Sequence, residues 1–328
     1  MPSVVVPAHN EERVIARLLS GLLEGSGNDD ELERLDDDER QRPRGDEGPS
    51  DPLEIVVVAN GCDDATAEVA RGFPGVRVIE TPMPSKSAAL RLGDEIASSF
   101  PRLYVDADVS LGAADMHELC RALDSPGVLA AGPARTLPMD GVAVPVRWYY
   151  DVWQRLPVVR EELFGRGVIA VSRSGHERLA PFLEAGEQIM ADDLAMSLAF
   201  GVEERVVVPA ARVVIRPPRT YRDLMRRRIR AMTGNARLAE GNSSPSGQPA
   251  GSSPGSSSGL TQTRTAPRTG PRDLLAVLTG EPGLGGRLRL APKLGVFLVT
   301  ATASRVLARR AVRRRDTEWL RDESSRDH

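Results

Sequence analysis

Two aspartates separated by one small residue end an apolar stretch in the segment YVDADVS, residues 104–110. If a strand covers residues 102–108, Asp106 and Asp108 face the same side, because side chains two positions apart on a strand do so. Two adjacent carboxylates raise each other's pKa unless a cation lies between them. Mg²⁺ or Mn²⁺ with oxygen ligands would bridge them to phosphate oxygens. The pair therefore indicates a metal–phosphate site, with two solvated strand-end acids as the alternative.

Other charged residues could complete such a site. Asp192 and Asp193 stand where a helix is expected to begin, so that they either serve as a general base or cap the helix. Lys86 opens another predicted helix after a turn-rich segment, a position that suits an anion. His9 lies in a loop, where a histidine is either structural or able to stack on a base.

A basic stretch, TYRDLMRRRIRAMTGNARL at residues 220–238, is predicted to be helical. Guanidinium groups bind phosphates in a bidentate manner, and residues three or four apart share a helix face. This stretch could therefore hold a diphosphate, form a solvated basic face or contact anionic lipid. Its candidate residues are Arg226, Arg227, Arg228 and Arg230.

Alternating strands and helices position these residues. Short apolar runs predict strands at residues 3–6, 53–60, 76–80 and 102–108, each followed by a segment with helical periodicity. Asn10 is expected to be the N-cap of the first helix, ahead of Glu11 and Glu12. This order predicts an α/β fold with a mostly parallel central sheet flanked by helices. Ligands bind beyond the carboxyl ends of such strands, where PAHNE, ANG and DAD all lie.

Composition divides the rest of the chain. Residues 26–52 are polar and acidic and are predicted to be a disordered insertion. Residues 128–215 have mixed structure, with a helix expected from about Asp192. A Ser/Gly/Pro-rich flexible linker is predicted at 239–272, followed by a helical basic tail at 273–328. The tail contains the apolar run LGVFLVTATA and several arginines.

Gross properties exclude several classes of protein. A formal net charge of −3 over 328 residues gives no global signal for nucleic acid. Cys62 and Cys120 cannot build a disulfide framework, and no Cys/His cluster has zinc spacing. We expect a cytoplasmic protein without a signal peptide. No run approaches the ~20 apolar residues of a membrane-spanning helix, and the tail is expected to associate peripherally with an anionic inner leaflet.

The order of the motifs resembles that of the family-2 inverting glycosyltransferases of the GT-A fold. The motifs are VVVPAHNEE, EIVVVANGCDDAT, SKSAAL with Gly93, YVDAD, GRGVIAVSR, ADDLAMSLAF and RRRIRAMTGN. The resemblance covers residues 1–238 apart from the acidic insertion, and it implies that these residues form one GT-A domain.

The resemblance implies a role for each matching residue. The base and ribose of the nucleotide would be held by Pro7, Ala8, His9, Glu11 and Asn60, the last replacing a usual acid. Lys86 matches a Gly-Lys position, with Ser85 in place of the glycine. Asp106 and Asp108 look like the D-x-D motif. Asp108 would be the direct metal ligand, while Asp106 would face the nucleotide.

The later motifs would supply the catalytic groups. Gly167 lies where the family shapes the sugar and acceptor pocket. Asp193 matches the catalytic base, and Asp192 replaces the preceding Glu. Arg227 and Arg230 lie where processive synthases carry Gln-x-x-Arg-Trp, whose Gln and Trp are missing here. The donor would be a UDP- or GDP-linked sugar and the cofactor Mg²⁺ or Mn²⁺. The acceptor would be a hydroxyl group in cell-envelope polysaccharide or glycolipid synthesis.

Other functions remain open from the sequence. A catalytically silent nucleotide-sugar-binding or membrane-associated scaffold would share the binding residues. A sugar-phosphate nucleotidyltransferase has a similar fold but normally a Gly-rich loop after its first strand, where this chain reads VPAHNEE. A dinucleotide-binding protein would carry G-x-G-x-x-G there.

Overall fold

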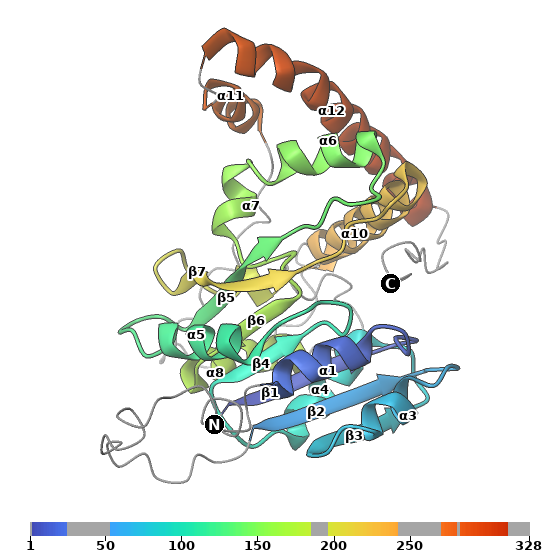
Figure 1. Cartoon of the computed structure of the whole chain (residues 1–328), viewed down its shortest axis with the longest axis vertical. Helices are drawn as coiled ribbons and strands as arrows, with labels where there is room; N and C mark the ends of the chain where they lie inside the picture. The colour runs from blue at the N-terminus through green and yellow to red at the C-terminus, as the bar shows by residue number, and fades with distance from the viewer. Residues whose placement is uncertain (1, 25–52, 185–195, 242–269, 281–282, 314–328) are drawn as a thin grey trace, which may run out of the picture.

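The computed structural model describes residues 2–24, 53–184, 196–241, 270–280 and 283–313 (Figure 1). The predicted acidic insertion at 26–52 lies outside these residues, as do Asp192 and Asp193. Most of the predicted linker and the end of the basic tail also lie outside them.

A seven-stranded sheet forms the centre of the fold, in the order β3-β2-β1-β4-β6-β5-β7. All pairings are parallel except those of β6, which runs antiparallel to both β4 and β5. The predicted α/β fold with a mostly parallel sheet is confirmed. The strands are β1 (Ser3–Ala8), β2 (Glu54–Asn60), β3 (Val76–Thr81), β4 (Arg102–Val105), β5 (Ala130–Thr136), β6 (Val168–Val171) and β7 (Arg205–Val214).

Helices cover both faces of this sheet. Alternate residues of β1 point to opposite faces, so Val4 and Val6 enter one buried cluster and Val5 the other. The first cluster is completed by α1 (Ile15–Leu23) and α5 (Ala113–Ala122), with α3 (Thr66–Arg71) at its edge. The second is completed by α4 (Lys86–Ile96) and α8 (Arg173–Glu184). Burial on both faces explains why β1 and β2 read as continuous apolar runs.

A separate helical layer holds the C-terminal part of the chain (Figure 1). It consists of α6 (Val144–Trp153), α7 (Pro157–Glu161), α10 (Tyr221–Gly241), α11 (Pro271–Thr279) and α12 (Gly283–Arg313). Tyr149 of α6 stacks on Phe297 of α12 with the ring centroids 5.3 Å apart, and both belong to a third buried cluster. The predicted helical character of the C-terminal tail is confirmed for its described part.

Two local predictions were wrong. β4 ends at Val105, so Asp106 and Asp108 lie in a turn beyond the strand and the expectation of a shared strand face does not hold. Asn10 is not a helix N-cap, because α1 begins only at Ile15 after Val14. Asn10 instead has a left-handed backbone with φ of 55°.

The apolar run LGVFLVTATA also belongs to a longer element than predicted. It lies inside α12, a helix of 31 residues in which basic side chains interrupt the apolar sequence without ending the helix. By length and composition alone, Gly285–Arg310 would be sufficient to cross a membrane.

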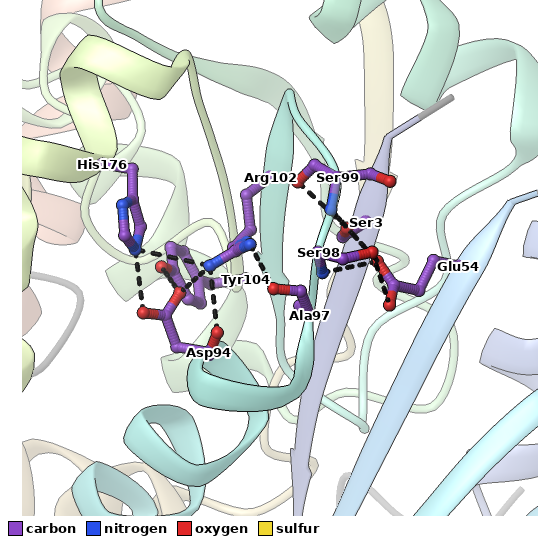
Figure 2. A network of polar contacts seen from close by, with 9 residues as sticks. All are labelled: Ser3, Glu54, Asp94, Ala97, Ser98, Ser99, Arg102, Tyr104 and His176. Carbon is purple, nitrogen blue, oxygen red and sulfur yellow. Dashed lines mark hydrogen bonds and ion pairs between the residues drawn. The ribbon is translucent and has the colours of Figure 1, made fainter.

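A polar network ties the amino ends of the central strands together (Figure 2). Ser3 at the start of β1 donates to the Glu54 carboxylate at the start of β2, with an O···O distance of 2.5 Å. Backbone N–H groups of Ser98 and Ser99 also donate to Glu54. Burial favours a neutral Glu54, but these hydrogen bonds outweigh it and lower the pKa of this carboxyl.

The second half of the network is centred on Asp94 of α4. Arg102 of β4 contacts the Asp94 carboxylate at 2.5 Å, and Tyr104 donates to it at 2.6 Å. His176 of α8 lies 2.8 Å from the other carboxylate oxygen. Burial raises the pKa of Asp94, but the hydrogen bonds from Tyr104, His176 and Arg102 together lower it. This network lies at the strand ends opposite to the predicted site and stabilises the fold.

Asp94→Asn should lower the free energy of unfolding by ~3 kcal/mol at neutral pH, because it leaves the buried Arg102 without its charge partner. The folded-state pKa of Asp94 lies below its usual value of 3.8, so its stabilisation is present above that pH and is lost as the pH falls through the folded-state pKa. The difference between wild type and variant in urea titrations should therefore shrink under acid conditions.

The adjacent carboxylate of α4 provides the control. Glu95 is exposed and pairs with Arg91 at 3.5 Å, in the part of the chain that the structure describes. Glu95→Gln should change stability by under ~1 kcal/mol. A loss in Glu95→Gln equal to that in Asp94→Asn would contradict the role given to Asp94.

Candidate functional site

The carboxyl ends of β1 and β2 lie side by side and are joined through side chains. His9 donates from Nδ1 to the carbonyl oxygen of Asn60 at 2.7 Å, and Asn60 donates from Nδ2 to the carbonyl oxygen of Ala8 at 2.8 Å. Pro7, Ala8 and Asn60 are buried, whereas His9 is half-buried. The structure thus brings the PAHNE and ANG segments together at the predicted edge.

The loop after β1 is fastened to the loop after β2. The backbone N–H of Glu11 donates to the Thr66 hydroxyl at 2.7 Å. The Asn10 side chain accepts from the N–H of Asp63 at 2.9 Å, and that of Glu12 accepts from Ala65 at 3.0 Å. These contacts fix the loop conformation in which Glu11 is buried.

The aspartate pair forms a turn that two other elements hold in place. The N–H of Asp106 donates to the carbonyl oxygen of Gly167 at 2.7 Å, and that of Val109 donates to Asp106 at 3.4 Å. Lys86, at the N-terminus of α4, lies 2.7 Å from the Asp106 carboxylate. Ser85 caps this helix by accepting from the N–H of Ala88. The predicted convergence of Lys86, Asp106 and Gly167 is therefore present in the structure.

Gly167 occupies a position that only glycine fits. Its φ is 65°, and a Cβ atom there would lie 2.6 Å from Val109 Cγ1 and 3.3 Å from an Asp106 carboxylate oxygen. Left-handed backbone is costly for residues with a side chain. Gly167 therefore combines a left-handed turn with close packing against the aspartate turn.

The segment before Gly167 is anchored by a buried guanidinium group. Arg166 donates to the carbonyl oxygens of Glu162, Pro133 and Arg160 at 3.0, 2.7 and 2.9 Å. Burial lowers the pKa of Arg166 to about 10. Glu162 in turn forms a buried ion pair with Arg205 at 2.7 Å. These contacts fix Gly167 relative to the sheet.

Two arginines that the sequence prediction missed lie beside the aspartate turn. Arg17 of α1 donates from Nη2 to the backbone carbonyl oxygen of Asp108 at 3.3 Å. Burial lowers the pKa of Arg17, the charge of Arg216 lowers it further, and Asp108 acts in the opposite direction. Arg216 follows β7, whose Val214 pairs with Ser110 through two backbone hydrogen bonds. Arg17 therefore lies beside Asp108, and Arg216 is close enough to Arg17 for its charge to lower the pKa of Arg17.

This neighbourhood also contains buried polar atoms that lack hydrogen-bond partners within the described part of the chain. They include Ser110 Oγ and Arg216 Nη1. Buried polar groups are normally satisfied, and an unsatisfied one costs ~1–3 kcal/mol. A guanidinium N–H and a hydroxyl group together suit an anionic oxygen ligand. No local spacing in the sequence would have placed Arg216 at this site, because it is the pairing of Val214 with Ser110 that brings this part of the chain to the aspartate turn.

The predicted arginines of α10 have different surroundings. Arg227 donates from Nη1 to the carbonyl oxygen of Arg216 at 3.4 Å, which places it next to the missed arginines. Arg226 pairs with Asp223 at 3.1 Å, and Arg228 lies 5.7 Å from the ring centre of Tyr149. Arg230 is half-buried on the same helix. Of the candidates with described contacts, Arg227 is therefore the one joined to the site.

Asp106 and Asp108 could hold a divalent cation that also binds oxygen atoms of a ligand. No group of three His, Cys, Asp or Glu side chains with metal-binding geometry occurs in the described ranges. Asp106 and Asp108 are two carboxylates, and Mg²⁺ is commonly held by one or two carboxylates together with phosphate oxygens and waters. A cation held by Asp106 and Asp108 would therefore need further oxygen ligands, which phosphate could supply.

Part of the chain matches a known protein family. Residues 3–156 match the family model described as Glycosyl transferase family 2. The resemblance to this family is confirmed. The match covers just under half of the chain and includes Lys86, Asp106 and Asp108, whereas Gly167 and the arginines of α10 lie beyond it. The predicted GT-A fold class is confirmed together with the sheet topology.

Similar solved structures include glucosyl-3-phosphoglycerate synthase from Mycobacterium tuberculosis. Its complex with Mn²⁺, UDP-glucose and phosphoglyceric acid has 16% sequence identity and a TM-score of 0.48, covering 73% of this chain and 79% of that chain. Its complex with Mg²⁺ and UDP has 18% identity and a TM-score of 0.45, with coverages of 73% and 78%. A mycobacterial protein has 15% identity and a TM-score of 0.46, with coverages of 73% and 74%. No curated protein matches this chain.

Gly167→Ala should destabilise the protein more than the same change at Gly141. Both glycines are left-handed, with φ of 65° and 69°, but a Cβ at Gly141 would meet nothing within 4 Å. Each substitution should cost ~1 kcal/mol through its backbone conformation. The clash with Val109 and Asp106 should add ~1–3 kcal/mol at Gly167. Denaturant unfolding of the two variants measures the difference, and equal losses would show that Gly167 is not packed against the aspartate turn.

Proposed function

We propose that this protein is a metal-dependent inverting glycosyltransferase that moves a sugar from a UDP- or GDP-linked donor to an acceptor hydroxyl. The observation that carries the proposal is the meeting of Asp106 and Asp108 with Lys86 and Arg17 at one edge of a sheet that matches glycosyltransferase family 2. Carboxylates alone would suit a metal, and cations alone would suit an anion. Both together suit a metal-bound diphosphate.

The nucleoside would lie over the carboxyl ends of β1 and β2. Pro7 and Ala8 are buried there, and His9 is half-buried. Glu11 and Asn60 take part in the hydrogen bonds that join the two loops. Because Asn60 donates its amide to Ala8, its role would be to position the loop that contacts the base.

Asp108, with Asp106 beside it, would hold a divalent cation, which when bound supplies positive charge that stabilises the departing diphosphate. Asp106 is paired with Lys86, so Lys86 would orient this carboxylate and present a second positive charge to the phosphates. Arg216, Arg227 and Arg230 would bind diphosphate oxygens from the other side. The unsatisfied Nη1 of Arg216 supports this role.

Asp193 would act as general base and take the proton from the acceptor hydroxyl, with Asp192 beside it. Both lie outside the described residues, and their assignment depends on the matching motif ADDLAMSLAF. Direct attack on the anomeric carbon from the side opposite the diphosphate would invert its configuration. Gly167, packed against Asp106, would shape the edge of the sugar and acceptor pocket.

Measurements of nucleotide binding and of sugar transfer distinguish the proposed role of Asp108 from that of Asp193. Thermal stabilisation by UDP or GDP with Mn²⁺ should be clear for wild type, since a ligand at a hundred times its Kd adds ~2.7 kcal/mol. Asp108→Asn should abolish the metal-dependent part of this shift. Asp193→Asn should retain the shift but lower turnover of the nucleotide sugar by at least ~100-fold, which is the usual effect of a general base.

Asp124→Asn, which removes an exposed carboxylate on the same domain, is the matched control and should behave as wild type. Undiminished metal-dependent binding in Asp108→Asn would remove that residue from the site. A wild type that binds nucleotide but turns over no UDP- or GDP-sugar with any hydroxyl acceptor offered would favour the silent binding protein instead.

A further inference from the structure

Helix α12 has two apolar faces, whereas a helix that only packs on a protein needs one. One face is buried against α6 and α10 and includes Leu290, Leu294 and Phe297. The opposite face is exposed and carries Leu288, Pro292, Gly295, Val299 and Val306, spaced three, four or seven residues apart. Leu288 is 66% exposed and Val299 is 64% exposed. We call these five residues the exposed α12 face.

Basic side chains border this face. Arg287 and Arg289 flank Leu288 on either side of the helix, because successive residues are about 100° apart. Arg305 lies beside Val306, with Arg309 and Arg310 in the next turn, and all five arginines are exposed. The sequence of α12 contains no Asp or Glu. The exposed α12 face is therefore an apolar strip with a purely cationic border.

The strip continues into a hollow on the protein surface. This hollow has a volume of about 440 Å³ and is lined by Pro145, Tyr221, Pro292, Gly295, Val296 and Val299. Val144, next to Pro145 at the start of α6, is also exposed. In Figure 1, α12 lies along the outer edge of the helical layer with α6 and α10 on its inner side. The apolar surface is thus wider than one helix.

We propose that the exposed α12 face docks on the surface of an anionic lipid bilayer, with the helix lying in the plane of the interface. Apolar side chains would enter the boundary between headgroups and acyl chains, while arginines of the border reach the anionic headgroups. This combination of an apolar strip and a border of exposed arginines matches a lipid surface in both chemistry and charge. The inference is independent of the glycosyltransferase assignment.

A spanning helix does not fit the contacts of the opposite face. Lys293 of α12 lies 2.5 Å from Asp151 of α6, and Tyr221 of α10 forms a hydrogen bond with Thr300 at 3.1 Å. Phe297 is stacked on Tyr149. A helix held along its length by α6 and α10 cannot enter the hydrocarbon core without breaking these contacts, including an ion pair.

A second copy of the chain is the less suitable occupant. Pairing of two exposed α12 faces would bring arginine borders together, and α12 offers no carboxylate to neutralise them. Like charges across an interface oppose association. Anionic headgroups supply the missing opposite charge.

Sedimentation of the full chain with lipid vesicles tests the proposal. Wild type should bind vesicles of equal parts phosphatidylcholine and phosphatidylglycerol and not vesicles of phosphatidylcholine alone, with binding weakened by salt. Val299→Glu should weaken binding at least about tenfold, because it places a charge where an apolar side chain would enter the bilayer. Val202→Glu is the matched control, since Val202 is also a 64% exposed valine but lies far along the chain on the sheet domain.

The cationic border has its own variants. Arg305→Gln and Arg309→Gln should each weaken binding about fivefold, since a basic residue near an anionic surface contributes ~1 kcal/mol. Arg77→Gln, an exposed arginine of β3, should have no effect. Unchanged melting curves establish that the variants fold. Failure of wild type to bind anionic vesicles would overturn the proposal, as would a wild-type dimer in light scattering that Val299→Glu converts to monomer.

Discussion

The hydrogen bond from the N–H of Asp106 to the carbonyl oxygen of Gly167 is the constraint on which the site depends. It lies where β4, the last strand of the parallel half, meets the antiparallel β6. β6 pairs with β5, which in turn pairs with β7, and Arg216 follows β7 two residues after its end. The hydrogen bond between Asp106 and Gly167 therefore joins the aspartate turn to the half of the sheet that carries Arg216.

Electrostatic balance within the site follows from this geometry. Lys86 pairs with the Asp106 carboxylate, whereas Arg17 donates to the backbone carbonyl oxygen of Asp108. The two aspartates are therefore not equivalent, since the carboxylate of one is paired with a lysine and the backbone of the other accepts from an arginine. This asymmetry is compatible with the metal-bound diphosphate proposed above.

Local sequence patterns predicted the elements well because burial on both sheet faces leaves continuous apolar runs. They could not predict where β4 ends, because that end depends on its partner: Val105 pairs with Val168, and the next residue of the partner strand is the left-handed Gly167. Nor could local patterns show that the Asn10 side chain accepts a hydrogen bond from the N–H of Asp63 instead of capping a helix. The position of Arg216 depends on the pairing of Ser110 with Val214, about a hundred positions apart, which no local pattern records.

Helix α10 contacts both the proposed nucleotide-sugar site and the helix α12 that is proposed to dock on lipid. Its Arg227 contacts Arg216 beside the aspartate turn, while its Tyr221 contacts α12 and lines the hollow next to the exposed α12 face. Docking of α12 on a bilayer would therefore hold the sheet edge at a fixed place relative to the lipid surface. An acceptor hydroxyl carried by a lipid would be presented to such an enzyme without diffusing through water.

A crystal structure of the protein with Mn²⁺ and UDP, and in parallel with Mn²⁺ and GDP, would test the central claim most directly. We predict one cation bound to the Asp108 carboxylate at ~2.1 Å and to oxygens of the diphosphate. Arg216 Nη1 should lie within hydrogen-bonding distance of the same diphosphate. A nucleotide bound away from residues 106–108, or a cation held without either aspartate, would contradict the account.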